Sequence, residues 1–434
     1  MNVQSTRAVR SLLAAIAICV SCVPRLARAG SMSSVVGGSG PPIPMELRPD
    51  ATPAWSYACS LHHPLCSRAA PGTPHRFQLD VLAAADRAWE AITGVLRAPP
   101  PEGAVGDPWE VYLVDTVEGG SRAVSNERDP LSRFDRESTF ALVDRETPTG
   151  CSLDFALARA IAEGSLRREA PATDIGSVRA QSEAVAHLMT PCAPPQENEA
   201  AFQAAPWRCI VDPGSEPFDR GASLFVEWVD ATFGTEPGSL PLGAWALAPT
   251  RTAPSASRWV GAPTTFDVLR ASLKGVLGRE TTFDDVLLKF LLARASIEPR
   301  PALSWSVPWP VRARRLTPAE PIAPTGASYV HVDCHGSPHG GKLRLEAQWE
   351  DYARMRWLVV KRDAANKTLA VLPVTSTDHG TAASMTVEEL DGVDHLLIVV
   401  QNLGSTEHAF DPDQGDWEPH GWLLTLEGQP ALGP

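Results

Sequence analysis

Basic residues are under-represented in this sequence of 434 residues. Lys and Arg total 38 against 51 Asp and Glu, which gives a formal net charge of −13. Proteins that bind nucleic acid or anionic membranes carry an excess of positive charge, so this balance argues against both kinds of partner. Aromatic residues are also few, at 7%, whereas hydrophobic residues at 44% are sufficient for a sizeable core.

The sequence also lacks an apolar run long enough to cross a membrane as a helix, which takes about 20 residues. The run from Leu12 to Val20 is shorter than this and follows two arginines. Ala27 and Ala29 then supply the small residues that a signal peptidase accepts. We therefore expect residues 1–29 to be a bacterial-type signal peptide, and the mature protein to be secreted or periplasmic with no membrane span.

Removal of residues 1–29 takes away four arginines and no acidic residue, so the formal charge falls from −13 to −17. Cys22 would permit a lipoprotein, an alternative that the better-formed cleavage site disfavours. Six cysteines remain in the mature chain: Cys59, Cys66, Cys151, Cys192, Cys209 and Cys334. An even number of cysteines in an exported protein favours disulfides over metal thiolates.

Two of the disulfides can be assigned from their positions. Cys59 and Cys66 close a short loop, and Cys151 and Cys192 bracket two helical patterns whose antiparallel packing would bring them together. The pairing of the last two cysteines stays open. Two histidines inside the first loop would allow a metal site with its thiols, but an oxidising compartment favours the disulfide.

The order of the patterns predicts an α+β protein with a mostly helical domain followed by an antiparallel β-sandwich. A Gly-, Ser- and Pro-rich flexible lead-in covers residues 30–53, and helical spacing dominates residues 54–299. Residues 300–325 are rich in Pro and Trp, which is typical of a linker. In the helical part we expect strands at 109–115 and 138–144 and helices at 82–96, 153–168, 176–189 and 219–233, followed by a helix pair beginning near 264 and 281.

Residues 326–434 show the pattern of strands. Leu343, Leu345 and Ala347 alternate with polar residues, as expected for a strand with one buried face. Seven such segments in about a hundred residues, separated by Gly and Asp turns, predict a β-sandwich. The segments are 328–333, 342–349, 355–361, 368–372, 383–390, 395–401 and 421–427.

No motif of known chemistry is present, since H-E-x-x-H, the P-loop and G-x-G-x-x-G are all absent. His331, Asp333 and His335 would share one face of a strand, which suits transition-metal ligation. The favoured interpretation is that these alternate polar residues mark the solvent-exposed face of the strand. An acidic run at 411–418 offers oxygen ligands for calcium but departs from EF-hand spacing, so an acidic turn is expected there. We therefore expect no cofactor.

The order of elements between Leu79 and Ser296 resembles secreted bacterial zinc metallopeptidases of the gluzincin type. The resemblance rests on a strand ending at Val111-Tyr-Leu-Val-Asp115, the helix pair, and the later helix from Gly221 to Asp230. In such enzymes the first helix of the pair carries H-E-x-x-H, and the second supplies a further glutamate ligand.

The resemblance implies that the motif falls on Arg159-Ala160-Ile161-Ala162-Glu163, with the third ligand near Asp174 or Ile175. Both histidines and the catalytic glutamate are missing there. Because a guanidinium cannot ligate zinc and alanine cannot activate water, the resemblance implies a peptidase-like fold without peptidase chemistry. In an unrelated α+β domain, Arg159 and Glu163 would instead form an ordinary i,i+4 pair on a helix surface.

Three functions follow from these observations. The first is an exported, non-enzymatic protein whose inactive peptidase-like domain is joined to a β-sandwich that binds a protein or glycan in the envelope or outside the cell. The second is a secreted hydrolase, a peptidase or cell-wall hydrolase, with Glu163 and Asp174 as an acid/base pair on facing helices. The third is a structural envelope protein with no saturable ligand.

Overall fold

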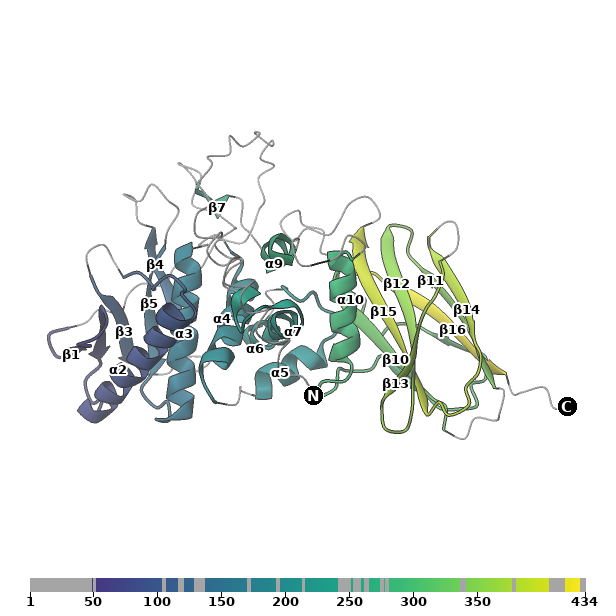
Figure 1. Ribbon diagram of the computed structural model, residues 1–434, viewed down its shortest axis with the longest axis horizontal. Helices are drawn as coiled ribbons and strands as arrows, with labels where there is room; N and C mark the ends of the chain where they lie inside the picture. The colour runs from purple at the N-terminus through teal and green to yellow at the C-terminus, as the bar shows by residue number, and fades with distance from the viewer. Residues whose placement is uncertain are drawn as a thin grey trace, which may run out of the picture. The chain divides into compact units, whose positions relative to one another are not determined.

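The structure is a computed structural model. It describes residues 49, 52–103, 107–115, 121–128, 137–169, 173–192, 196–212, 215–240, 251–252, 259–260, 265–273, 277, 281–335, 341–376, 380–405 and 418–429. The predicted signal peptide and the acidic segment 411–417 lie outside these residues. Helices and strands both contribute to the fold, which confirms the α+β class (Figure 1).

The first half of the chain contains a mixed five-stranded sheet in the order β1-β2-β3-β5-β4. The central strands β2, β3 and β5 are parallel, whereas β1 and β4 pair antiparallel at the two edges. The sequence patterns predicted β3 and β5 and missed the other three. The strands are β1 (Ser56–Cys59), β2 (Leu65–Ala69), β3 (Trp109–Val114), β4 (Ser121–Arg128) and β5 (Glu137–Asp144).

Two helices pack against one face of this sheet. They are α2 (His75–Trp89), which continues as the π-helix η1 (Glu90–Val95), and α3 (Cys151–Glu169). Their apolar residues share one core with alternate residues of β3 and β5. Gly164 permits close approach of α3 to the sheet, because a Cβ there would lie 2.9 Å from the Thr139 hydroxyl.

The next helices form a second core that is rich in phenylalanine. The Phe225 and Phe290 rings, for example, meet edge to face with centroids 5.0 Å apart. The predicted helix 219–233 is divided into α6 and α7 at Ala222, beside a glycine whose Cβ would lie 2.1 Å from the Asn198 carbonyl oxygen. The helices are α4 (Ile175–Met189), α5 (Gln196–Ala204), α6 (Glu216–Gly221), α7 (Ser223–Phe233), α9 (Thr265–Leu273) and α10 (Phe283–Arg294); β6 (Arg251–Thr252) and β7 (Trp259–Val260) form a two-stranded ribbon between α7 and α9.

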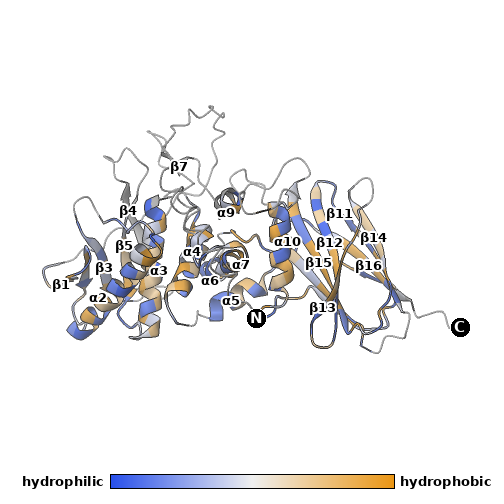
Figure 2. Ribbon diagram, viewed as in Figure 1, coloured by the Kyte–Doolittle hydropathy of each residue, from blue (hydrophilic) through white to orange (hydrophobic). Residues whose placement is uncertain are grey.

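The last part of the chain forms two sheets, in the orders β13-β12-β15-β10-β8 and β14-β11-β16-β9. Residues of both sheets share one hydrophobic core, and hydrophobic and hydrophilic segments alternate along β11 and β12 (Figure 2). All seven predicted strands are present. They are β10 (Ala327–Asp333), β11 (Lys342–Trp349), β12 (Ala353–Arg362), β13 (Thr368–Pro373), β14 (Ala382–Val387), β15 (His395–Ser405) and β16 (Trp422–Gln429).

The segment predicted as a linker supplies one further strand to each sheet. These are β8 (Trp305–Val307) and β9 (Arg314–Leu316). Strand β8 pairs parallel with β10, whereas the other pairs in the two sheets are antiparallel. Pattern analysis missed both strands because neither is long enough to establish an alternation.

Helix α10 joins the helical core to the first of these sheets. The Tyr329 hydroxyl of β10 donates a hydrogen bond to the Leu291 carbonyl, at 2.9 Å. Thr282 and Asp285 form the capping box at the start of α10, close to the residue where the sequence predicted the second helix of the pair to begin. Asp285 also accepts a hydrogen bond from Arg356 of β12, at 2.9 Å, so one side chain caps the helix and ties it to the sheet.

Both predicted disulfides are present, between Cys59 and Cys66 and between Cys151 and Cys192. The question left open for the other two cysteines is answered, because Cys209 and Cys334 are each free and buried. Within the described part of the chain, no helix combines the length and apolar character needed to cross a membrane.

Replacing Asp285 with Ala should lower the free energy of unfolding by about 1–2 kcal/mol, because it removes a cap and an ion pair together. The neighbouring variant Asp284→Ala is the matched control, since Asp284 lies 3.9 Å from Arg354 and takes no part in the capping box. Asp284→Ala should lower the free energy of unfolding by less than half as much as Asp285→Ala. Urea unfolding of both variants measures the difference, and equal losses would contradict the dual role of Asp285.

Candidate functional site

Charged side chains are buried where α3, α4 and α6 meet. Helix α3 contributes Arg159 and Glu163, α4 contributes Glu183, and α6 contributes Glu216 and Arg220. Four of these five residues are at most 3% exposed. We call these five residues the ionic cluster. Charged groups are seldom buried without partners, so the cluster is the strongest candidate for a specialised site in the helical region.

Glu183 lies at the centre of the ionic cluster. Its Oε2 atom is 3.5 Å from Nη1 of Arg159 and 3.5 Å from Nη1 of Arg220. Its Oε1 atom accepts a hydrogen bond from the Asn198 side-chain amide, at 2.8 Å. One buried carboxylate from α4 is therefore held by two guanidinium groups that come from two different helices.

Further ion pairs extend the cluster on both sides. Arg220 lies 2.5 Å from Glu216 one turn earlier in α6, and Glu163 lies 3.5 Å from Arg167 one turn later in α3. Arg179 bridges α4 to Glu216 at 3.5 Å and to Asp219 at 2.8 Å. The helices are thus cross-linked by charge along the line where they pack.

The pKa values reflect competition between burial and opposite charge. Burial and the like charge of Arg220 together lower the pKa of Arg159 to about 10, against the opposing attraction of Glu183. Burial would also lower the pKa of Arg220, but Glu183 and Glu216 outweigh it and raise the value. Both guanidiniums therefore stay protonated at neutral pH, and Glu183 meets two cations.

The two predicted acid/base residues have different environments. Glu163 belongs to the ionic cluster, where one carboxylate oxygen is buried and accepts no hydrogen bond from the described residues. Asp174 is the N-cap of α4 and accepts a hydrogen bond from the Ser177 amide, at 2.7 Å. It precedes Glu183 by nine residues, which is about 13 Å along a helix. The second helix therefore presents Glu183, and not Asp174, to Arg159.

Sequence reasoning missed Glu183, Glu216 and Arg220, although a signal for Glu183 was present. It stands directly before Ala184-Val185-Ala186, within a helix that is buried along most of its length. A carboxylate in such surroundings needs a cationic partner. Arg220 gave no comparable signal, because its proximity to Glu183 arises from tertiary packing.

A second titratable pair lies near the end of α4. The Nδ1 atom of His187 is 2.5 Å from Oε1 of Glu227 on α7, and the His187 ring packs on Phe155 with centroids 5.2 Å apart. Burial would lower the pKa of His187, but the hydrogen bond and the negative charge of Glu227 outweigh it and raise the pKa above 6.5. The pair therefore favours the imidazolium form.

The histidine segment at the end of β10 does not converge on a metal site. His331 packs on His395 with ring centroids 4.9 Å apart, and the Asp333 carboxylate accepts a hydrogen bond from the backbone amide of His335, at 2.9 Å. Asp394 lies within 3.4 Å of the His335 ring. Over the described ranges, no three or more His, Cys, Asp or Glu residues are arranged to hold a metal ion.

No described protein family and no curated protein matches the sequence. Among solved structures, the pre-peptidase C-terminal domain of a Bacillus anthracis collagenase is 9% identical, covers 30% of this chain and 98% of its own, and gives a TM-score of 0.20. The Aeromonas hydrophila periplasmic inhibitor of g-type lysozyme is 12% identical, with coverages of 30% and 100% and a TM-score of 0.19. A chitosan-binding module from Paenibacillus is 12% identical, with coverages of 26% and 74% and a TM-score of 0.16. Scores this low carry no argument about function.

Replacing Glu183 with Gln should lower the free energy of unfolding by about 3 kcal/mol, because the change leaves two buried guanidiniums without their shared counter-ion. The control is Glu346→Gln, which removes a carboxylate from an exposed pair with Arg344 and should cost less than about 0.5 kcal/mol. Chemical denaturation provides both values. A loss below 1 kcal/mol for the Glu183 variant would show that the ionic cluster is not an energetic centre.

The His187–Glu227 pair should stabilise the folded protein more at low pH than at high pH. Because the folded-state pKa is raised, the stabilisation is fully present below pH 6.5 and is lost as the pH rises through the folded value. The gap in unfolding free energy between wild type and His187→Gln should therefore shrink by on the order of 1 kcal/mol between pH 6 and pH 9. Urea unfolding at both pH values tests this, with the exposed His75→Gln as control; a gap that widens would contradict it.

Proposed function

We propose that the chain is an exported protein with a catalytically inactive peptidase-like domain, residues 54–299, and a β-sandwich binding module, residues 326–434. The ionic cluster is the observation that carries the first half of this proposal. On the resemblance to gluzincin-type peptidases, Arg159 and Glu163 occupy the positions of the two histidine ligands. Glu183 on the second helix faces Arg159 at 3.5 Å.

The chemistry of the cluster supports an inactive site. A metal centre needs lone pairs directed at one cation, whereas two of the groups nearest Glu183 are guanidiniums, which have no lone pair to donate. Their positive charge takes the role of counter-ion to the buried carboxylate. Ala160 stands where the resemblance requires a glutamate that activates water, and it is fully buried.

The binding half of the proposal rests on the C-terminal sheets. The shared core of the two sheets supports the interpretation of this region as a β-sandwich. The edge strand β13 carries Leu369 and Val371 two residues apart, so they lie on one face, and they are 49% and 42% exposed. We propose that the module binds a protein or glycan of the cell envelope or exterior. The two disulfides support the export proposed from residues 1–29, which lie outside the described residues.

Metal analysis and an activity assay test the inactive-domain proposal together. The purified mature protein should contain well under one equivalent of zinc and should hydrolyse neither casein nor insoluble peptidoglycan above background. One equivalent of zinc, abolished by changing a mature histidine, would overturn the proposal. Hydrolysis that disappears in Glu163→Gln would instead establish the alternative of a secreted hydrolase.

The same preparation separates a binding module from a purely structural protein. Mixed with insoluble peptidoglycan or chitin, the full chain should co-sediment to saturation with at least one of the two if the ligand is a wall glycan. The double variant Leu369→Ser and Val371→Ser should leave glycan binding unchanged if those residues serve a protein partner. Binding that rises linearly without saturation would favour the structural role.

A further inference from the structure

The edge strands β8 and β9 of the two C-terminal sheets are held together by a tryptophan. The Trp305 indole N–H of β8 donates a hydrogen bond to the carbonyl of Thr317, the residue after β9, at 2.5 Å. The Trp309 ring lies against Gly428 near the end of β16, where an added Cβ would be 3.1 Å from the ring. Both indoles are partly exposed. Strand β8 is at the opposite end of its sheet from β13, so these tryptophans are separate from the exposed apolar residues of β13.

Three exposed arginines lie at the same edge, either in β9 or just before it. The Arg314 guanidinium of β9 lies over the Trp305 ring, with its central carbon 5.7 Å from the ring centre. Such a contact positions a cation without neutralising its charge. We call the two tryptophans and the three arginines together the basic edge: Trp305, Trp309, Arg312, Arg314 and Arg315.

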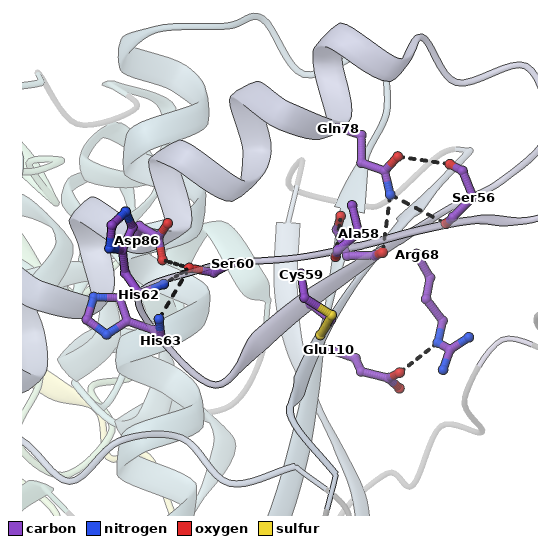
Figure 3. The surroundings of a disulfide bond; sticks show 12 residues. Ser56, Ala58, Cys59, Ser60, His62, His63, Arg68, Gln78, Asp86 and Glu110 are labelled. Carbon is purple, nitrogen blue, oxygen red and sulfur yellow. Dashed lines mark hydrogen bonds and ion pairs between the residues drawn. A yellow bond between two sulfur atoms is a disulfide. The ribbon is translucent and has the colours of Figure 1, made fainter.

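The three guanidiniums of the basic edge form no ion pair with any residue in the described part of the chain. Arginines elsewhere have carboxylate partners. Arg68, for example, lies 2.6 Å from Glu110 (Figure 3). The exposed Arg344 of β11 lies 2.5 Å from Glu346. Acidic residues outnumber basic ones by 51 to 38, so a group of arginines without acidic partners is a local departure from the charge balance of the chain.

The arginines of β9 do not converge on one point. Neighbouring residues of a strand direct their side chains to opposite faces of the sheet. In the ladder with β16, Arg314 is opposite Leu426 and Arg315 is opposite Thr425. The two guanidiniums therefore diverge, and they suit several negative charges spaced along a chain better than one small anion.

The tryptophans favour a sugar chain as the carrier of those charges. A partly exposed indole offers a flat apolar surface beside polar groups, which complements the C–H face and hydroxyl rim of a pyranose. A uronic acid carries its carboxylate directly on the sugar ring, so a ring packed on an indole brings the carboxylate close to the arginines. Guanidinium and carboxylate groups are both planar and can form two parallel hydrogen bonds.

We propose that the basic edge binds an acidic polysaccharide of the polyuronate class, with its guanidiniums pairing with successive carboxylates and its indoles packing on the sugar rings. The inference rests on the proposed function of the C-terminal sheets as a binding module, and it names the class of ligand and the surface that binds it.

The negative charge of the whole chain does not oppose this binding at close range. At physiological ionic strength, charges more than about 8 Å apart are largely screened, so the arginines determine the potential at the basic edge. Nucleic acid is a less suitable polyanion, because proteins that bind it typically make on the order of six to ten phosphate contacts. The basic edge has only three cations.

Calorimetric titration of the full chain with oligogalacturonate tests the proposal. Binding should saturate, and Arg314→Gln combined with Arg315→Gln should raise the Kd at least about tenfold, because charge-assisted hydrogen bonds are lost. The control combines Lys342→Gln with Arg344→Gln, which removes the same charge from exposed ion pairs of β11. The control should change the Kd less than about twofold. Equal weakening by both pairs of changes would overturn the proposal.

Both variants should unfold at the wild-type temperature, since all four substituted side chains are exposed. Methyl-esterified oligogalacturonate is the matched ligand control, because it has the same sugar chain without the carboxylate charges. It should bind at least about tenfold more weakly, and equal affinity for the two ligands would overturn the proposal.

Other outcomes separate this inference from the proposed function. Saturable binding to chitin or peptidoglycan, without binding to oligogalacturonate, would overturn the inference and leave the binding module in place. No saturable binding to any of these glycans would overturn the inference and the glycan half of the proposed function. Binding only to a single-stranded oligonucleotide or to phosphatidylglycerol vesicles, lost in the arginine variant, would assign the basic edge to a different ligand and overturn the inference.

Discussion

The helical region depends on one carboxylate placed between two guanidiniums. Glu183 is 1% exposed, and without Arg159 and Arg220 its negative charge would be buried against Ala-rich helix surfaces. Arg159 and Arg220 depend on Glu183 in the same way, because each guanidinium loses its hydration when the helices pack. None of the three helices can be moved independently without separating opposite charges in a medium of low polarity. The ion pairs that neutralise the buried charges therefore also determine how these helices pack.

This constraint also explains why α3 and α4 depart from the usual amphipathic pattern. Arg159, Glu163 and Glu183 are buried on surfaces where an apolar stripe would be expected. Apolar residues in their place would pack as well or better, because buried ion pairs rarely exceed hydrophobic contacts in stability. Charged residues do, however, restrict which faces of the helices can meet. We therefore interpret the ionic cluster as a feature that specifies how the helices pair.

The sequence was informative wherever burial imposes a regular spacing of apolar residues over a few positions. Alternation predicted β11, and the other six C-terminal strands, like β3 and β5, were predicted as short segments of strand-forming residues. Strand β4 has a polar sequence that resembles a turn, and β8 and β9 are three residues each. Of the five residues of the ionic cluster, the sequence pointed only to Arg159 and Glu163; Glu216 and Arg220 gave no signal, because α6 reaches the cluster only through tertiary packing. The disulfides were predictable, since both pairs are set by local elements.

One of those disulfides has a topological consequence. It joins the first residue of α3 to a residue just beyond the end of α4, with a sequence separation of 41. The helix pair is therefore a covalent ring, and Arg159, Glu163 and Glu183 all belong to it. Closing a ring of this size removes roughly 4 kcal/mol of chain entropy from the unfolded state. Two of the three helices that bring the charges together thus remain neighbours in the denatured protein, and only α6, with Glu216 and Arg220, must be recruited from outside the ring.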